Sequence, residues 1–264
     1  YEIPEGSKTA KGRAIQNLIN IEQDDKIQAF ICTQDLKDEE YINSHYVIMA
    51  TKKGQVKKTS LEQYSRPRAN GINAISIRED DELLEAKLTN GNSHVILAVK
   101  SGKAIRFEES KTRPMGSGAS GVRGITLADA SDEVVGMVSV NDMDAHILVV
   151  SENGYGKRSD LEDYRITNRG GKGVKTISIT EKTGKLVAIK TVNDQDDLMI
   201  INKSGIAIRM EIATLRVMGR ATQGVRLINL KGNDTIAAVA KVMKDDETIE
   251  DVADLDVNDG TIIE

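Results

Sequence analysis

Several residue types that mark common protein classes are scarce or missing in this sequence. Its 264 residues include one cysteine, three histidines and no tryptophan. A lone cysteine, Cys32, cannot form an internal disulfide, which favours a reducing compartment such as the cytoplasm. So few Cys and His residues also exclude a cysteine-rich zinc module. Aromatic residues make up 3% of the chain, too few for the stacking platforms of proteins that bind single-stranded nucleic acid.

Long apolar runs are missing as well. Typical runs cover four residues, at 47–50, 147–150 and 198–201, whereas a membrane-spanning helix needs about 20. The segment from Tyr1 to Glu5 has neither the basic start nor the apolar core of a signal peptide. We therefore expect no membrane partner. Because the chain does not begin with Met, we also expect it to be a piece of a longer protein.

Motifs of catalytic sites are absent from the sequence. There is no Gly-x-Ser-x-Gly, no phosphate-binding loop that ends in Gly-Lys-Ser/Thr, and no His-Glu-x-x-His. Residues 170–173 are glycine-rich, but they join two predicted strands, which disfavours a nucleotide-binding loop. His94 and His146 belong to different repeat units, so we expect no metal site. The sequence predicts neither a catalytic residue nor a cofactor in this chain.

The charge is unevenly distributed along the chain. The formal net charge is −5, but residues 244–264 alone hold nine acidic residues and one lysine, so residues 1–243 have a net charge of +3. We therefore divide the chain into a body, 1–243, and a flexible acidic tail, 244–264. A mildly basic body favours a polyanionic partner. The tail either competes for the basic surface or serves solubility, and both roles fit its composition.

Two motifs repeat through the body. The hairpin motif is an apolar run, a glycine turn and a basic residue, at 46–58, 94–106, 146–158 and 197–209, with turn glycines Gly54, Gly102, Gly154 and Gly205. The glycine motif is a glycine followed by alternating apolar residues, at 10–18, 69–77, 119–127, 171–179 and 222–230, with Gly12, Gly71, Gly121, Gly173 and Gly224. Equivalent glycines are 48 to 59 residues apart, which indicates one structural repeat per interval.

Each repeat is predicted to hold about four short strands, because apolar and polar residues alternate and the Gly turns are typical of hairpins. Such units favour a radial, propeller-like all-β array. A β-sandwich is the alternative, but it does not explain the regular glycine spacing. WD40 and kelch repeats are disfavoured because both use Trp. Five glycine motifs accompany four hairpin motifs, so we expect a further hairpin upstream of Tyr1.

Basic residues recur at fixed places in the repeats. One lies at position +4 after each hairpin glycine, and another at +2 after three of the motif glycines. Equivalent positions of a radial array lie at equivalent radii, so these cations predict a basic rim for the phosphates of duplex DNA. The alternative is local pairing with acids such as Glu62, Glu108, Glu162 and Glu211. The candidate DNA-binding residues are Arg13, Lys57, Lys58, Arg66, Arg68, Arg106, Lys111, Arg113, Arg123, Lys157, Arg158, Arg165, Arg169, Lys172, Lys175, Arg209, Arg220 and Arg226.

Longer stretches carry a family resemblance. MATKKGQVKKT (49–59), RPMGSGASGVRGI (113–125), SENGYGKRS (151–159) and VMGRATQGVRLI (217–228) resemble the C-terminal domain of the DNA gyrase A subunit, and the resemblance extends to about residue 243. The loop Thr167-Asn168-Arg169-Gly170-Gly171-Lys172-Gly173 resembles the signature box of that family, Gln-Arg-Arg-Gly-Gly-Lys-Gly, at five of seven positions. By the order of blades, the family's own box is expected just upstream of Tyr1, and this box-like loop belongs to the fifth blade.

The resemblance implies a six-bladed β-pinwheel in the complete domain, with strands exchanged between blades; this chain carries about five blades' worth of repeats. It implies that duplex DNA bends around the basic rim. The holoenzyme, with two A and two B subunits, ATP and magnesium, then introduces negative supercoils in the bacterial cytoplasm, at the nucleoid. The tyrosine that cleaves DNA belongs to another part of the A subunit, so we expect no catalytic tyrosine here.

Two other interpretations remain. The equivalent domain of the topoisomerase IV A subunit is the closer one, but that family usually has fewer blades and a degenerate box, so the repeat count favours gyrase. The other is a protein-binding β-propeller, which would use its top face and bind independently of salt. DNA wrapping predicts instead a site on the rim and a steep salt dependence.

Overall fold

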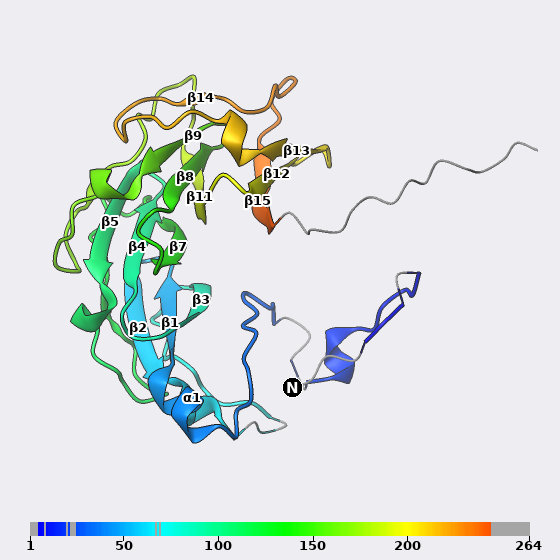
Figure 1. Ribbon diagram of the computed structural model, residues 1–264, viewed down its shortest axis with the longest axis vertical. Helices are drawn as coiled ribbons and strands as arrows, with labels where there is room; N and C mark the ends of the chain where they lie inside the picture. Colours follow the sequence, from blue (N-terminus) through cyan, green and yellow to red (C-terminus); the bar gives the residue numbers. More distant parts are fainter. Residues whose placement is uncertain are drawn as a thin grey trace, which may run out of the picture.

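The computed structural model describes residues 5–7, 9–19, 21, 25–66, 68 and 70–243. The described chain consists of antiparallel β-sheets that follow one another along a curved arc (Figure 1). Three sheets have four strands and the last has three. The repeated all-β blades predicted from the sequence are confirmed, while the acidic tail, 244–264, lies outside the described residues.

Every sheet has the same strand order from the inner to the outer side of the arc (Figure 1). The first sheet consists of β3 (Leu83–Thr89), β1 (Tyr46–Thr51), β2 (Gln55–Ser60) and β6 (Val122–Arg123). The second consists of β7 (Val134–Val140), β4 (His94–Val99), β5 (Lys103–Glu108) and β10 (Val174–Lys175). The third consists of β11 (Leu186–Val192), β8 (His146–Ser151), β9 (Tyr155–Asp160) and β14 (Val225–Arg226). The fourth consists of β15 (Ile236–Met243), β12 (Asp196–Asn202) and β13 (Ala207–Glu211).

Short helical turns accompany the strands. The six-residue helix α1 (Glu39–Ser44) precedes β1, and the carboxylate of Asp38 caps it by accepting hydrogen bonds from the N–H groups of Glu40 and Tyr41. A 3-10 turn follows each hairpin, and another lies near the N-terminus: η2 (Leu61–Tyr64), η3 (Glu109–Lys111), η4 (Leu161–Asp163), η5 (Ile212–Thr214) and η1 (Ile15–Asn17). The turns that follow the hairpins lead the chain away from the second strand of each hairpin.

The hairpin motif forms two paired strands in each sheet, as predicted, and these are the two central strands of the four-stranded sheets. β1 pairs with β2 from Tyr46 opposite Ser60 to Ala50 opposite Val56. The turn residue Gly54 has a φ of +84°, which residues with a side chain rarely adopt. The other three hairpin glycines also have positive φ, which explains why glycine recurs at this place.

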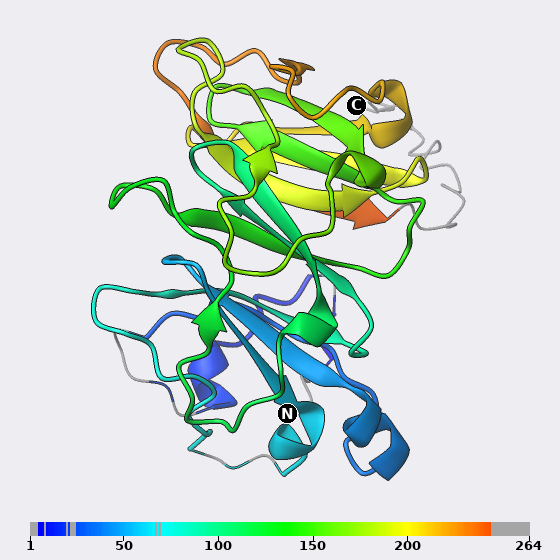
Figure 2. The ribbon, with the colours of Figure 1, turned by 90° about the vertical axis from the view of Figure 1, so that its left-hand side faces the viewer.

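The outermost strand of each four-stranded sheet comes from the next unit of the chain. β6 follows the hairpin β4–β5 in sequence but pairs with β2 of the first sheet, and β10 and β14 join β5 and β9 in the same way. Glycine is needed where this strand meets the hairpin, because a Cβ on Gly121 would lie 2.5 Å from the carbonyl oxygen of Val56. The glycine motif is therefore a strand-exchange motif, and Figure 2 shows the exchanged segments from the outer side of the arc.

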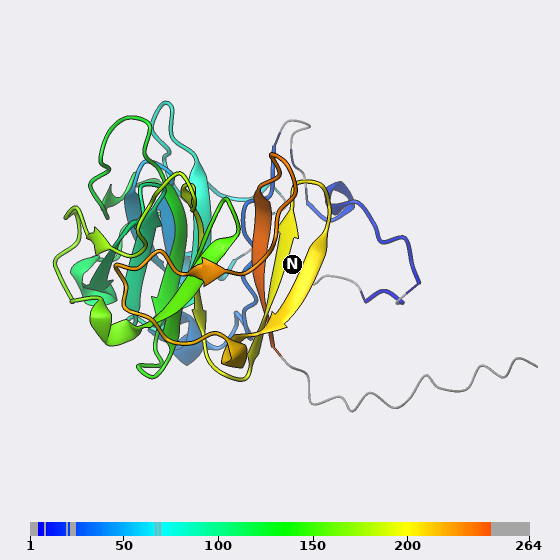
Figure 3. The same ribbon diagram turned by 90° about the horizontal axis from the view of Figure 1, so that it is seen from above.

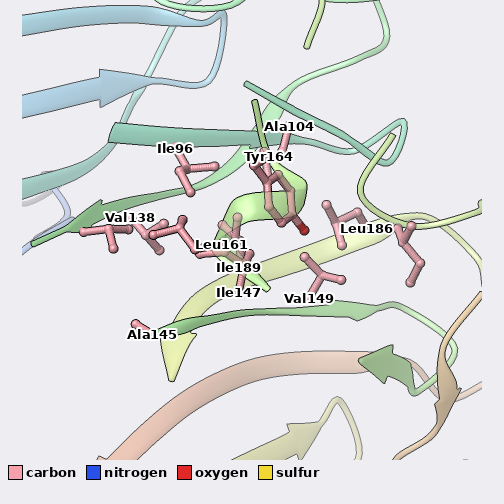
Figure 4. Close-up of a cluster of buried hydrophobic side chains, with 13 residues drawn as sticks. Ile96, Ala104, Val138, Ala145, Ile147, Val149, Leu161, Tyr164, Leu186 and Ile189 are labelled. Carbon is pink, nitrogen blue, oxygen red and sulfur yellow. The ribbon is translucent and has the colours of Figure 1, made fainter. Parts of the chain in front are cut away.

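The apolar side chains pack between successive sheets, and Figure 3 shows the ribbon of these sheets from above. One buried cluster between the second and third sheets includes Ile96, Ile147, Leu161 and Tyr164 (Figure 4). Tyr164 is 1% exposed, and its hydroxyl lies 2.5 Å from that of Thr176. Similar clusters fill the other two spaces between sheets. The hairpins of the second and third sheets thus bury both of their faces, which accounts for their almost continuous apolar runs.

Two of the five glycine motifs form no strand in the described chain. The segment around Gly12 contains η1, which buries no residue, and the segment around Gly71 is a loop. At the other end of the arc, β13 pairs only with β12 among the described residues, and a Cβ on Gly205 would meet no atom within 4 Å. The described chain therefore forms four sheets, while the sequence carries about five blades' worth of repeats. Because each outer strand is supplied by the following unit, two glycine motifs, not one, lack a hairpin here.

Candidate nucleic-acid interface

The cations at position +4 of the hairpin motif lie mostly in the interior. Lys58, Arg106 and Arg158 are 4%, 6% and 6% exposed. Each lies on the second strand of a hairpin, which has neighbouring strands on both sides. The expected place of these three residues on the surface of a rim is therefore wrong.

Arg106 shows the role of these buried side chains. Its Nη1 donates hydrogen bonds to the carbonyl oxygens of Leu161 (2.8 Å) and Tyr164 (3.3 Å), and its Nε donates to Nδ1 of His94 (2.8 Å). Burial lowers the pKa of the Arg106 guanidinium from its ordinary value, although nearby Glu162 raises it. An arginine stays charged in proteins, so Arg106 is a buried cation that fastens η4 to the second sheet.

Lys58 and Arg158 have the same role at the neighbouring junctions. Nζ of Lys58 donates to the carbonyl oxygen of Glu109 (3.3 Å) and lies 3.7 Å from the carboxylate of that residue. Nε of Arg158 donates to the carbonyl oxygen of Leu215 (2.5 Å), and its guanidinium forms an ion pair with Asp194. Pairing with a nearby acid, the alternative interpretation of this series, holds for Lys58 with Glu109 and for Arg158 with Asp194. Arg106 forms no ion pair among the described residues, and the acid that acts on it is Glu162, as suggested by the sequence.

Two lysines at position +3 are buried as well. Lys57 and Lys157 are 0% and 1% exposed. Nζ of Lys57 donates to the carbonyl oxygens of Ala74 and Ser117, and Nζ of Lys157 to that of Gly219, each at 2.5 Å. Burial lowers the pKa of Lys57, and it lowers the pKa of Lys157 to about 8. Both side chains hold glycine-motif loops against a sheet, so neither lies on the expected rim.

Arg209 is the one +4 cation among the described residues that reaches the surface. Its side chain is 53% exposed, because no following unit covers the fourth sheet in the described chain. Its Nε donates to the carboxylate of Asp197 at 2.6 Å. The positive charge of Arg209 is therefore balanced by the neighbouring carboxylate of Asp197.

A row of exposed cations follows the outer side of the arc, at position +2 of the glycine motif. Arg123, Lys175 and Arg226 end the outermost strands β6, β10 and β14 of three successive sheets, and all three are exposed. An outermost strand has a partner on one side only, so its edge stays in solvent. Arg226 also donates from Nη2 to the hydroxyl of Tyr155 (2.8 Å). We call these three residues the rim cations.

The loops beside the outermost strands add further positive charge. Arg165 and Lys172 line a surface hollow of about 240 Å³ together with Thr167 and Asn168. Arg169 and Arg220 are partly buried, and each donates to a backbone carbonyl of a neighbouring outermost strand. The other loop cations of this region are exposed, namely Lys111, Arg113 and Arg216.

The box-like loop, residues 167–173, lies against the preceding outermost strand. Its Gly170 N–H donates to the carbonyl oxygen of Gly124 (2.6 Å). In return, the N–H and the hydroxyl of Thr126 donate to the carbonyl oxygens of Gly171 (2.9 Å) and Gly170 (2.7 Å). Gly170 has a φ of +86°, which residues with a side chain rarely adopt, and a Cβ on Gly173 would lie 2.5 Å from the carbonyl oxygen of Ala104.

Three candidate residues lie outside the sheets. Arg13 precedes η1, whereas Arg66 and Arg68 follow η2, and all three are exposed. They belong to the two segments whose glycine motifs form no strand among the described residues. They are therefore not part of the row of rim cations.

One buried carboxylate of the interior carries no sequence signal. Glu109 is fully buried, accepts hydrogen bonds from the hydroxyl of Thr89 (2.7 Å) and the N–H of Ser93 (3.3 Å), and pairs with Lys58. Its neighbour Glu108, which the sequence suggested, is partly exposed. β5 ends between the two residues, so the alternation of the strand does not tell which carboxylate faces inward.

Two further features are absent from the described residues. No helix there is both long and apolar enough to cross a membrane. No three Cys, His, Asp or Glu side chains gather there as metal ligands would.

Comparisons of the sequence point to one family. A family model described as DNA gyrase C-terminal domain, beta-propeller, matches residues 1–34, 45–90, 94–141, 145–193 and 196–243. The DNA gyrase A subunit of Staphylococcus aureus strain NCTC 8325 / PS 47 is 46% identical over 255 residues, which are 95% of this chain and 28% of that protein. The corresponding protein of strain MRSA252 is 46% identical over 264 residues, 99% of this chain and 29% of that protein. The chain thus spans a little over a quarter of the length of these relatives.

Two solved structures share the fold. The C-terminal domain of DNA topoisomerase IV matches with a TM-score of 0.80 and 24% identity, over 88% of this chain and 71% of that one. The C-terminal domain of DNA gyrase A matches with a TM-score of 0.77 and 25% identity, over 89% of this chain and 76% of that one. The matched repeats follow the same intervals as the hairpins and exchanged strands described above. The chain belongs to the family of DNA gyrase A C-terminal domains.

Proposed function

We propose that this chain is the DNA-wrapping part of a gyrase A protein, and that it bends duplex DNA around the outer side of its arc. The observation that carries this proposal is the row of rim cations, Arg123, Lys175 and Arg226, on the outermost strands of three successive sheets. Their equivalent places in the repeat give regularly spaced contacts along a curved surface. Contacts with phosphates position DNA without reading its bases, so the wrapping is independent of sequence.

The electrostatic gain is large enough to bend DNA. Bending about 20–30 bp smoothly through about 40–90° costs on the order of 1–6 kcal/mol. Each phosphate contact contributes about −0.9 to the slope of log affinity against log salt, so about six contacts from rim cations and loops give a slope near −5. Affinity gained at low salt offsets the bending energy, and wrapping weakens steeply as salt rises.

In the complete protein, wrapping serves an enzyme whose chemistry lies outside this chain. The relatives are DNA gyrase A proteins, and the chain covers 28% of their length. In our proposal the chain itself is non-catalytic, and it acts with the rest of the A subunit and with B subunits in an A2B2 enzyme of the bacterial cytoplasm and nucleoid. That enzyme uses ATP and magnesium. The wrapped DNA presents a neighbouring segment in one orientation, which gives supercoiling its negative sign.

The A subunit of a topoisomerase IV is the second candidate, because the C-terminal domain of such an enzyme has this fold with a TM-score of 0.80. The gyrase match has a similar TM-score, 0.77, so the fold does not separate the two. The 46% identity to a gyrase A protein supports the gyrase assignment. ATP-dependent introduction of negative supercoils into relaxed plasmid by the full-length protein and its B subunit is expected of gyrase alone.

The proposal is tested by the linking number of a relaxed plasmid that is bound by the full-length protein and treated with topoisomerase I. We expect a linking-number change at about 50 mM salt that fades toward about 200 mM. A protein without residues 244–264 shows whether the tail competes for the rim. Salt-sensitive binding without a linking-number change would mean that the domain holds DNA without wrapping it. No binding at low salt would contradict the proposal and favour a protein-binding propeller.

A further inference from the structure

The outer parts of successive sheets are joined by a repeated backbone hydrogen bond. At each junction, the residue five places after a motif glycine donates its N–H to the carbonyl oxygen two places before the next motif glycine. The three pairs are Ser76 to Ala119 (3.2 Å), Thr126 to Gly171 (2.9 Å) and Ser178 to Thr222 (3.0 Å). Three consecutive junctions along the rim are therefore built alike.

An arginine adds a second connection at the middle junction. Arg169 lies four places before Gly173 and donates from Nη1 to the carbonyl oxygen of Arg123 (3.2 Å). Its Nε donates to the carbonyl oxygen of Lys111 (3.0 Å). The guanidinium thus spans two backbone segments of the preceding unit.

The last junction repeats this arrangement. Arg220 lies four places before Gly224, and its Nη1 donates to the carbonyl oxygen of Lys175 (2.8 Å). Its backbone N–H donates to the carboxylate of Asp163 (3.2 Å). At the first junction the equivalent residue is Ser117, which has no guanidinium to make this connection.

The carbonyl groups that accept these bonds belong to two of the rim cations, Arg123 and Lys175. A hydrogen bond to a backbone oxygen fixes where that residue stands relative to the next outermost strand. Guanidinium N–H groups point in fixed directions within one plane, whereas a lysine ammonium is a compact charge on a flexible stem. An arginine therefore fixes the distance and direction from one rim cation to the next more firmly than a lysine does.

We propose that Arg169 and Arg220 are positioning residues that set the path of wrapped DNA while contributing little to its affinity. They do so by holding successive outermost strands at a fixed distance and orientation relative to each other. This inference rests on the proposed function. Arg169 is the third residue of the box-like loop, so the loop acts here as a connection between two sheets.

The test is a double variant that keeps the charge, Arg169→Lys with Arg220→Lys, in the full-length protein with its B subunit. The slope of log affinity against log salt should equal that of the parent, because the number of cations is unchanged. The linking-number change left in a relaxed plasmid should fall at least twofold. ATP-dependent supercoiling should slow in parallel.

The chain offers a control that also keeps the charge, Arg78→Lys. Arg78 is exposed and belongs neither to the rim cations nor to the loops beside them. We expect this variant to keep the parent values of salt slope, linking-number change and supercoiling rate. Urea unfolding checks the fold of each variant. If the double variant unfolds, the single variants Arg169→Lys and Arg220→Lys test the positioning role instead. Each is expected to give a linking-number change between those of the parent and the double variant.

The outcomes separate this inference from the function on which it rests. A parent that wraps and a folded double variant that wraps equally would overturn the inference and leave the proposed function intact. An equal loss in the control variant Arg78→Lys would overturn it as well. In a second pair that removes the charge, Arg169→Gln with Arg220→Gln, a salt slope flattened by about two units would overturn the inference by assigning both arginines to direct phosphate contact. A parent that leaves no linking-number change would refute the proposed function, and the inference with it.

Discussion

The interior cations and the rim cations come from the same repeat and have opposite environments. Arg106 and Arg158 are 6% exposed on hairpin strands with neighbours on both sides, whereas Arg123 and Lys175 are exposed on outermost strands. In the sequence, both series are one basic residue at a fixed distance from a glycine. The comparison teaches that periodicity locates a cation within the repeat, while packing of the next repeat decides whether that charge reaches solvent.

The interior cations have a physical task that the rim cations lack. A 3-10 turn leaves backbone carbonyl groups without a partner inside the turn, and a buried carbonyl without a hydrogen bond destabilises the fold. Arg106 supplies donors to Leu161 and Tyr164, and Arg158 supplies one to Leu215. A buried positive charge is thus tolerated because it joins one unit to the next.

The largest effect is expected at an interior junction. Replacing Arg106 by Met leaves the carbonyl groups of Leu161 and Tyr164 without this donor, which should lower the free energy of unfolding by about 2–4 kcal/mol. Urea unfolding measures this loss, and the salt slope of DNA binding should stay unchanged. The exposed Arg165→Met is the control, with a change below about 0.5 kcal/mol expected. Equal free energies of unfolding for Arg106→Met and Arg165→Met would contradict the claim that interior cations stabilise the fold more than exposed cations do.

The next effect concerns DNA binding by the rim cations. Changing all three to Gln should flatten the slope of log affinity against log salt by about 2.7, since each phosphate contact contributes about 0.9. The free energy of unfolding should hardly change, and the loss should be alike for all DNA sequences. The control triple consists of exposed lysines at or beside hairpin turns, Lys53→Gln, Lys185→Gln and Lys203→Gln. Loss of binding to one DNA sequence alone would contradict non-specific contacts.

A smaller effect is expected from the pH dependence of stability at Lys157. Burial lowers its pKa in the folded chain to about 8 from 10.5. The unfolded chain therefore holds more protons between these values, so the contribution of Lys157 to the free energy of unfolding rises with pH across that window. Below about pH 8 the penalty for burying the charge is fully present.

The check compares the parent with Lys157→Met, which does not titrate. The stability difference, measured by urea unfolding from about pH 7 to about pH 10, should shift in favour of the parent as pH rises. Lys172→Met, at an exposed lysine of the rim loops, should show no such shift. A pH-independent difference at Lys157 would mean that its ammonium stays solvated.

The smallest effect is expected at His94. Burial, and secondly the charge of Arg106, lower the pKa of His94 below 6.5, although Glu108 raises it. The unfolded chain then takes up a proton near pH 6.5 before the folded chain does, so the free energy of unfolding falls as pH drops below that value. His94→Gln keeps an acceptor for Arg106 but does not titrate. Thermal unfolding from about pH 7 to about pH 5 should show a shallower decline in the variant, and parallel profiles would contradict this.

The repeats and their turns were predictable because local rules determine them. Gly54 and Gly121 have positive φ, and the alternation of apolar residues in the hairpin motif forms strands in the predicted places. The fold class followed from the same patterns, whereas the family followed from the resemblance of longer stretches such as residues 113–125 and 217–228. These features depend on a few neighbouring residues, so the sequence shows them directly.

The environments of the cations were not predictable, because they depend on contacts between distant units. Gln55 pairs with Arg123 from the following unit, and this exchange decides which strand is outermost. It also leaves the motifs at Gly12 and Gly71 without a hairpin in the described chain. Burial of Lys157 likewise results from its bond to Gly219, in a loop of another repeat. Periodicity alone contains none of this information.

The most direct test of the central claim is arginine footprinting of the full-length protein, free and bound to duplex DNA. Arginines are modified with phenylglyoxal, and the extent at each position is measured by mass spectrometry. We predict that Arg123 and Arg226 react in the free protein and are protected by DNA, while Arg106 and Arg158 stay unreactive in both states. Rim arginines that react equally with and without DNA, or protection that appears at Arg106 instead, would contradict the claim that the rim cations hold the DNA.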